Sequence, residues 1–230
     1  MPAAPGACHH HGVNPRPFRL RTLTIGDDPA GWAAAGFTID DDTIRIADTT
    51  ISLVGTDAGR GILAATVDGL AGPVDGMPFA TAADGNDRSA TRHANLVSEL
   101  DHLVAMSPDM DRTTDALSRA GLELRRTRTF AVGGGVRRQC FFWLGDVILE
   151  LVGDDAAHGD GPAQLWGLAF TSTDLADSAR LLGDRLGSAK PAVQKGREIA
   201  TLRTAALDIS VPIVFMSAHG PAGPADPADA

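Results

Sequence analysis

The chain has 230 residues, of which 43% are hydrophobic and 21% charged, so it can form one sizeable domain or two small ones. Its formal net charge of -9 offers no basic face for phosphate, which argues against nucleic acid and membrane surfaces as partners. It has two cysteines and no apolar run of about 20 residues, so we expect neither a disulfide framework nor a membrane span, and a cytoplasmic location.

Three stretches have few of the apolar residues that a packed core needs. Residues 1–17 are rich in Ala, Pro, Gly and His, and residues 219–230 are rich in Gly, Pro, Ala and Asp. We expect a disordered leader and a disordered tail there, because little burial offsets the entropy of ordering. Residues 71–97 are rich in Gly, Pro, Asp and Asn and are longer than most connections within a domain, which predicts a linker.

Residues 18–70 are similar to parts of the sequence beyond this linker. The segment AGFTI (35–39) matches AGLEL (120–124), ISLVG (51–55) matches LELVG (149–153), and GILA (61–64) matches GLAF (167–170). Internal similarity of this kind predicts repeated structural units. The N-terminal copy is shortened, and it has Ser52 where the later copy has Glu150.

Residues 98–155 predict a strand, a helix and three further strands. The first strand, near 100–106, leads into a helix that Asp109 can cap and Gly121 can end. Strands are expected at 122–129, 138–144 and 147–152. Gly145 and Asp146 are typical of a tight hairpin turn between the last two.

Residues 164–218 repeat this order. A strand is expected at 166–172, a helix at 175–186, and strands near Val193 and at 199–203 and 209–217. Aligning Asp174 with Asp109 places Gly167 opposite His102 and Phe215 opposite Glu150. One copy therefore keeps a His and a Glu, and the other offers neither.

The hairpin predicts which side chains share a face. With Gly145 and Asp146 in the turn, Phe141 pairs with Glu150, and Glu150 points away from the helix-covered side into a cavity. The side chains expected on this face are Gln139, Phe141, Trp143, Ile148 and Glu150, with Trp166 and Phe215 added if the second copy curls around them. Aromatic residues in strands are more often part of a core, so packing is the alternative.

A repeated βαβββ unit with a His in its first strand and a Glu in its last resembles the vicinal oxygen chelate, or glyoxalase-like, superfamily. The resemblance rests on LDHLV (100–104) with the helix start at Ser107, Pro108 and Asp109, and on ILELV (148–152). It implies an α+β fold in which paired βαβββ modules, 98–155 and 164–218, form a cup-shaped sheet. Residues 18–70 would be an extra, truncated module that packs on the others or pairs across a dimer.

The resemblance also implies a metal site. In that superfamily a divalent metal is held by one residue from each first strand and one from each last strand. The matching positions here are His102 and Glu150 in one module and Gly167 and Phe215 in the other. Three protein ligands are the usual minimum for a tight zinc site, so we expect one zinc, nickel, manganese, iron or cobalt ion, or none. Asp101, Gln139 and His219 are candidate sources of a further donor.

Two functions remain open. One is a small-molecule enzyme of the lyase, isomerase or dioxygenase type with a reduced metal site and Glu150 as its catalytic carboxylate. The other is a protein of the same fold that binds a small ligand without turnover. In both, the partner is a small molecule, and paired modules allow a homodimer. Arg125, Arg126 and Arg128 could orient a carboxylate or phosphate, although solvated strand-end arginines are the commoner outcome.

Overall fold

The computed structural model describes residues 18–81 and 91–219. The expected leader and nearly all of the expected tail lie outside the described residues, as do residues 82–90 of the expected linker. Among the described residues, no helix has the length and apolar character needed to cross a membrane.

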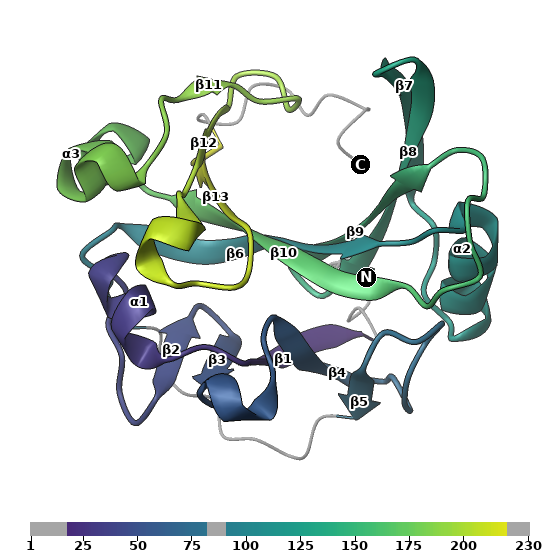
Figure 1. Ribbon diagram of the computed structural model, residues 1–230, viewed down its shortest axis with the longest axis horizontal. Helices are drawn as coiled ribbons and strands as arrows, with labels where there is room; N and C mark the ends of the chain where they lie inside the picture. Colours follow the sequence, from purple (N-terminus) through teal and green to yellow (C-terminus); the bar gives the residue numbers. More distant parts are fainter. Residues whose placement is uncertain (1–17, 82–90, 220–230) are drawn as a thin grey trace, which may run out of the picture.

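A curved eight-stranded sheet forms the larger layer of the molecule (Figure 1). Its first module contains β6 (Val97–Met106), α2 (Met110–Arg119), β7 (Arg126–Val132), β8 (Gly135–Leu144) and β9 (Val147–Asp154). Its second contains β10 (Gln164–Ser172), α3 (Leu175–Leu182), β11 (Lys190–Pro191), β12 (Glu198–Thr201) and β13 (Ile213–Ser217). The strand order is β11-β12-β13-β10-β6-β9-β8-β7, so the modules join edge to edge where β10 pairs antiparallel with β6. The predicted α+β cup of paired βαβββ modules is confirmed.

The same local chemistry begins the helix of each module. Asp109 and Asp174 each accept a hydrogen bond from a backbone N–H three residues further on, which satisfies one free donor of the helix N-terminus. Ser107 and Ser172, two residues earlier, each accept a hydrogen bond from the backbone N–H of that Asp. The helices lie on opposite flanks of the curved sheet (Figure 1). The concave face is thereby left open for a cavity.

A five-stranded sheet forms the second layer. It contains β1 (Arg19–Ile25), β2 (Thr43–Ile46), β3 (Thr49–Leu53), β4 (Ile62–Asp68) and β5 (Phe79–Thr81), with α1 (Pro29–Ala34) after β1. β1 pairs parallel with β3 and antiparallel with β4. These are the relations that β6 has with β9 and β10 in the larger sheet. The unit formed by β1, α1, β2 and β3 therefore has the same topology as the later modules but lacks one strand.

Part of the stretch expected as a linker belongs to this sheet. β5 pairs parallel with β4, and Met77 and Phe79 are buried. Further on, the buried side chain of Asn95 donates to the carbonyl of Ala35 at 2.9 Å. These anchors were missed because they are isolated residues in a stretch that is rich in Gly, Pro, Asp and Asn. The residues at which the chain divides into domains stay a prediction.

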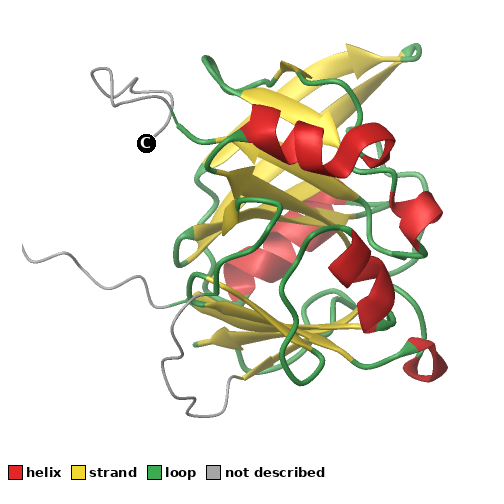
Figure 2. Ribbon diagram, turned by 90° about the vertical axis from the view of Figure 1, so that its left-hand side faces the viewer, coloured by secondary structure: helices red, strands yellow, loops and turns green. Residues whose placement is uncertain are grey.

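The two sheets pack face to face, and Figure 2 shows them as separate layers. The convex side of the larger sheet supplies Phe170 and Phe215, which contact Phe37 from the N-terminal layer at centroid distances of 5.3 and 6.3 Å. Phe37 also contacts Trp32 of α1 at 5.4 Å. Buried aromatic rings remove large apolar areas from water, so this cluster is a main source of stability between the layers.

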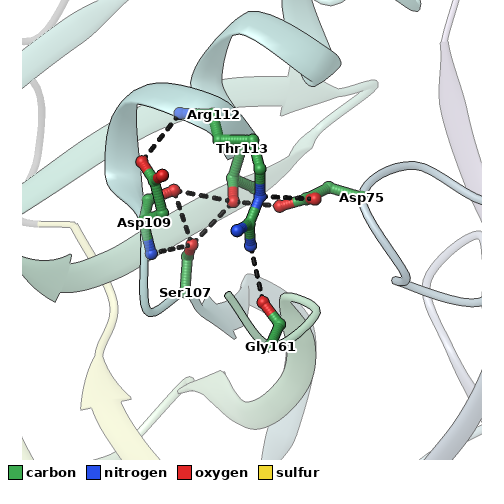
Figure 3. Close-up of polar contacts among 6 residues, drawn as sticks. All are labelled: Asp75, Ser107, Asp109, Arg112, Thr113 and Gly161. Atoms are coloured by element: carbon green, nitrogen blue, oxygen red, sulfur yellow. Dashed lines mark hydrogen bonds and ion pairs between the residues drawn. The ribbon is translucent and has the colours of Figure 1, made fainter. Parts of the chain in front are cut away.

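A polar cluster links the N-terminal layer to α2 (Figure 3). Thr113, which is fully buried, donates to the carboxylate of Asp75, and Arg112 Nε donates to the same carboxylate at 2.9 Å. Arg112 Nη2 also donates to the carbonyl of Gly161 at 2.6 Å. Hydrogen bonds to charged groups are stronger than neutral ones, so the cluster fixes the loop after β4 against the start of α2.

Candidate functional site

A cavity of about 560 Å³ is lined by side chains of the concave face of the larger sheet and also by residues of β1 and of the turn between β2 and β3, and its volume suits a small organic molecule. Six of the predicted site residues line it: His102, Gln139, Phe141, Trp143, Ile148 and Glu150. The strand pairing explains this placement. Leu144 pairs with Val147 and Phe141 with Glu150, as the two-residue turn predicted. Side chains of alternate residues on β8 and β9 therefore point into the cavity.

Two predicted site residues do not line the cavity. Phe215 is fully buried on the opposite, convex side, where its ring packs against Phe170. Trp166 is 47% exposed, because the pairing of β10 with β6 shifts between Leu165 and Gly167 and leaves Trp166 as the extra residue of a bulge. Val214 and Met216 of β13 line the cavity instead. The expectation for Trp166 and Phe215 was wrong.

The counterpart of Glu150 in the second module is Val214 and not Phe215. Glu150 pairs with Val104, five residues before the helix-capping Asp of its module, and Val214 pairs with Ala169 at the same place in the other. The second module has one residue fewer between its cap and its last strand, and a slip of one residue moves a side chain to the other face. Gly167 remains the counterpart of His102. In the second module, Gly167 and Val214 therefore offer no side-chain atom that could bind a metal.

His102 lies beside a buried ion pair. In the pairing of β6 with β10, Ala169 is opposite His102 and Phe170 is opposite Leu100, so Asp101 is the extra residue of a bulge. The bulge places the carboxylate of Asp101 next to the His102 ring. Nδ1 of His102 lies 2.8 Å from Asp101 Oδ1, at ion-pair distance but without the alignment of a hydrogen bond. His102 is only 6% exposed.

Arg197 occupies the other oxygen of this carboxylate. Its Nη2 lies 2.6 Å from Asp101 Oδ2, and Thr171 Oγ1 donates to the same oxygen at 2.8 Å. The guanidinium also donates to the carbonyl of Ser217 at 2.8 Å and to Gln194 Oε1 at 2.5 Å. Arg197 is 3% exposed, so the pair is shielded from water on both sides. Such an arrangement fixes the position of Asp101.

Asp101 stays ionised in this environment. Burial acts to raise the pKa of Asp101, but the nearby charges of His102 and Arg197 and the close contact with the guanidinium outweigh it and hold that pKa well below its usual range. An ionised carboxylate next to Nδ1 of His102 favours a proton on that nitrogen. Nε2 is then the ring nitrogen that can accept a proton.

Glu150 lies in the opposite kind of environment. Burial raises the pKa of Glu150, and the charge of His102, a hydrogen bond from Gln139 and the charge of Arg128 only partly offset the increase. Gln139 Nε2 donates to Glu150 Oε1 at 2.5 Å, and Gln139 Oε1 accepts from Arg128 Nη1 at 3.3 Å. Glu150 can therefore hold a proton where Asp101 cannot. Carboxyl groups with diverging pKa values in one cavity are a mark of acid–base sites.

The donors around this cavity do not fit a tight metal site. His102 and Glu150 lie on one face of adjacent strands, but no cluster of three His, Cys, Asp or Glu side chains that could hold a metal ion occurs in residues 18–81 and 91–219. Asp101 is occupied by Arg197 and Thr171, and both ends of the Gln139 amide are engaged. A tight site needs at least three protein ligands.

Comparison with known proteins identifies the fold. No protein-family model matches the sequence, and no curated protein sequence matches it. A mutant of 4-hydroxymandelate synthase from Streptomyces coelicolor matches in structure with a TM-score of 0.62 and 13% identity, over 90% of this chain and 94% of that one. An extradiol ring-cleaving dioxygenase from B. fuscum matches with a TM-score of 0.54 and 13% identity, over 90% and 74%. The chain has the vicinal oxygen chelate fold.

A third solved structure leads to the same fold. A xylose isomerase-like TIM barrel/4-hydroxyphenylpyruvate dioxygenase fusion protein matches with a TM-score of 0.56 and 14% identity, over 89% of this chain and 50% of that one. At these identities the likeness concerns the fold alone. The fold implied by LDHLV and ILELV is thus confirmed, and the reaction of this chain must be inferred from its own residues.

Sequence reasoning missed the role of Arg197. It follows a loop of Gln, Lys and Gly with no regular pattern, and its partner Asp101 lies 96 residues earlier. The available signal was Asp101 itself. An acid in a largely apolar central strand must be paired when it is buried, so a distant arginine or lysine partner could have been sought.

Proposed function

We propose that this chain is a small-molecule enzyme of the isomerase or lyase type, in which His102 and Glu150 transfer protons on a substrate bound in the cup. The observation that carries the proposal is the contrast between two carboxyl groups. Asp101 stays ionised beside His102, and the pKa of Glu150 is raised by burial in the same cavity. An acid and a base that face one cavity supply both halves of a proton transfer.

The proposed step begins with a substrate that carries a C–H bond next to a carbonyl group. His102 Nε2 accepts the proton from carbon, and the imidazolium that forms is stabilised by ionised Asp101. Glu150 in its protonated form donates its proton to the carbonyl oxygen, which gives a neutral enol and a Glu150 carboxylate. Return of one proton to a carbon and of the other to Glu150 completes an isomerisation.

Deuterium incorporation in heavy water tests this step. Phenylacetone and phenylpyruvate both have an acidic C–H bond next to a carbonyl, and proton NMR follows its loss. We expect the protein to accelerate exchange, and Glu150→Gln and His102→Asn to reduce the acceleration by about 100-fold or more. The matched control is Glu99→Gln, which changes an exposed carboxylate at the edge of the same cavity and should leave the rate unchanged.

The second candidate is a protein that binds the same kind of ligand without turnover. This candidate is favoured because Gly167 and Val214, which take the places of His102 and Glu150 in the second module, have no side-chain atoms that could bind a metal. Binding of both ketones with exchange at the uncatalysed rate would make this the leading function. A metal-assisted reaction is tested in the same assay: exchange that is lost with a chelator and restored by zinc, nickel, manganese, iron or cobalt would overturn the metal-free step.

A further inference from the structure

Arg128 stands out among the charged side chains of the cavity. It lies on β7 directly opposite Gln139 of β8, and it is half-buried in the cavity wall. Of the other arginines that line the cavity, Arg19 on β1 pairs with Asp48, Arg125 pairs with Glu123 at 3.0 Å, and Arg126 also has a partner. Arg128 makes no ion pair with a carboxylate in the described part of the chain.

The contacts that Arg128 does make leave most of its donors unused. Nη1 donates to Gln139 Oε1 at 3.3 Å, and the guanidinium carbon lies 5.0 Å from the centre of the Phe130 ring. Hydrogen bonds from N–H groups to oxygen are usually about 2.7–3.2 Å long, so the 3.3 Å contact with Gln139 is weak. The ring stacking holds the guanidinium in place and takes up none of its N–H groups.

We propose that Arg128 binds the carboxylate of the substrate, and that the ligand is therefore a small aryl or acyl carboxylic acid. This inference rests on the proposed function and names its substrate class. The planar fork of one guanidinium matches the two oxygens of a carboxylate. A phosphate dianion brings more charge and more acceptor atoms than this single unpaired arginine can satisfy, so a carboxylate is the better match.

The position of Arg128 gives the ligand a direction. The Gln139 amide separates Arg128 from Glu150, because its oxygen accepts from the arginine and its nitrogen donates to the acid. A carboxylate on Arg128 would thus lie one amide away from the reacting group. The body of the ligand would cover Phe141 and Trp143, which line the wall on the same face of β8. The reacting carbon would then be placed near the acid–base pair.

Calorimetry with phenylacetate and its neutral analogue phenylacetamide tests this placement in the full-length protein. We expect phenylacetate to bind at least about tenfold more tightly than the amide, and Arg128→Gln to weaken phenylacetate alone by about 10- to 100-fold. Arg128→Lys keeps the charge and should lose only part of the affinity. The control, Arg180→Gln, removes an exposed arginine of α3 that does not line the cavity and should change the affinity by less than about twofold.

The outcomes separate this inference from the proposed function, because phenylacetate reports binding and the ketones report proton transfer. Equal binding of acid and amide, no binding of phenylacetate, or full affinity in Arg128→Gln would overturn the carboxylate site even if phenylacetone is exchanged. Binding that depends on Arg128 without exchange of either ketone would keep the carboxylate site and overturn the enzyme. If Arg128→Gln does not fold, Arg128→Lys decides: a partial loss of phenylacetate affinity with unchanged binding of phenylacetamide supports the inference, and an unchanged phenylacetate affinity contradicts it.

Discussion

Replacing Arg197 by methionine would leave Asp101 buried without its cation. The two side chains are 2% and 7% exposed, so little water can replace the lost partner. Breaking a buried pair by removing one member typically costs about 3–5 kcal/mol, and we expect the free energy of unfolding to fall by that amount at pH 7. Removing Arg197 also takes away donors to Ser217 and Gln194, which places the cost toward the upper end.

The double variant Asp101→Asn/Arg197→Met separates the ion pair from simple loss of packing. With both charges gone, no unpaired charge is buried, and the loss should be smaller than the sum of the two single losses by about 3 kcal/mol. Urea unfolding of the four proteins, followed by circular dichroism, measures this difference. A loss below about 1 kcal/mol for Arg197→Met, or single losses that add, would refute the buried pair as a stabilising unit.

The pH dependence of stability should follow the pKa of Asp101, because a lowered pKa means that the folded state prefers the charged form. Ionised Asp101 therefore contributes to the free energy of unfolding above the pKa of the unfolded state, 3.8, and this contribution is lost as the pH falls from there through the pKa of the folded state. Parallel stability curves for the wild type and Asp101→Asn from pH 7 to pH 3 would contradict this. For Glu150 the effect on stability has the opposite sign, because its raised pKa means that the ionised form destabilises the folded state. Glu150→Gln should therefore raise the melting temperature at pH 7 and raise it much less at pH 4. A larger increase at pH 4 would be evidence against burial as the cause of the raised pKa. Phe215→Ala should lower the free energy of unfolding by about 3–5 kcal/mol, measured in urea, because the ring is fully buried. Trp166→Ala, at a half-exposed bulge, should lower it by less than about 1 kcal/mol. Similar losses in the two variants would contradict the faces assigned to Phe215 on β13 and Trp166 on β10.

The parts of the site that the sequence predicted depend on local chemistry. Gly145 and Asp146 form the turn between β8 and β9, and a two-residue turn fixes the pairing of Phe141 with Glu150. Asp109 and Asp174 cap their helices through contacts within three residues. Because these contacts are short in sequence, the module, its repeat and most of one cavity wall could be predicted.

The missed features depend on bulges and on distant contacts. Asp101 and Trp166 are extra residues in the pairing of β6 with β10, and the alternation of a strand does not reveal where such a residue lies. One residue fewer in the second module moved Phe215 from the cavity into the core. Arg197 is paired with Asp101 across the sheet, and no local pattern around Arg197 points to it.

The pH dependence of deuterium exchange into phenylpyruvate tests the central claim most directly. Exchange needs a neutral His102 and a protonated Glu150, so the rate should fall as the pH rises through the raised pKa of Glu150. Glu150→Gln should abolish the acceleration at every pH, while Glu99→Gln keeps the wild-type profile. An unchanged rate and profile in Glu150→Gln would contradict the claim that Glu150 and His102 form the acid–base pair of this cup.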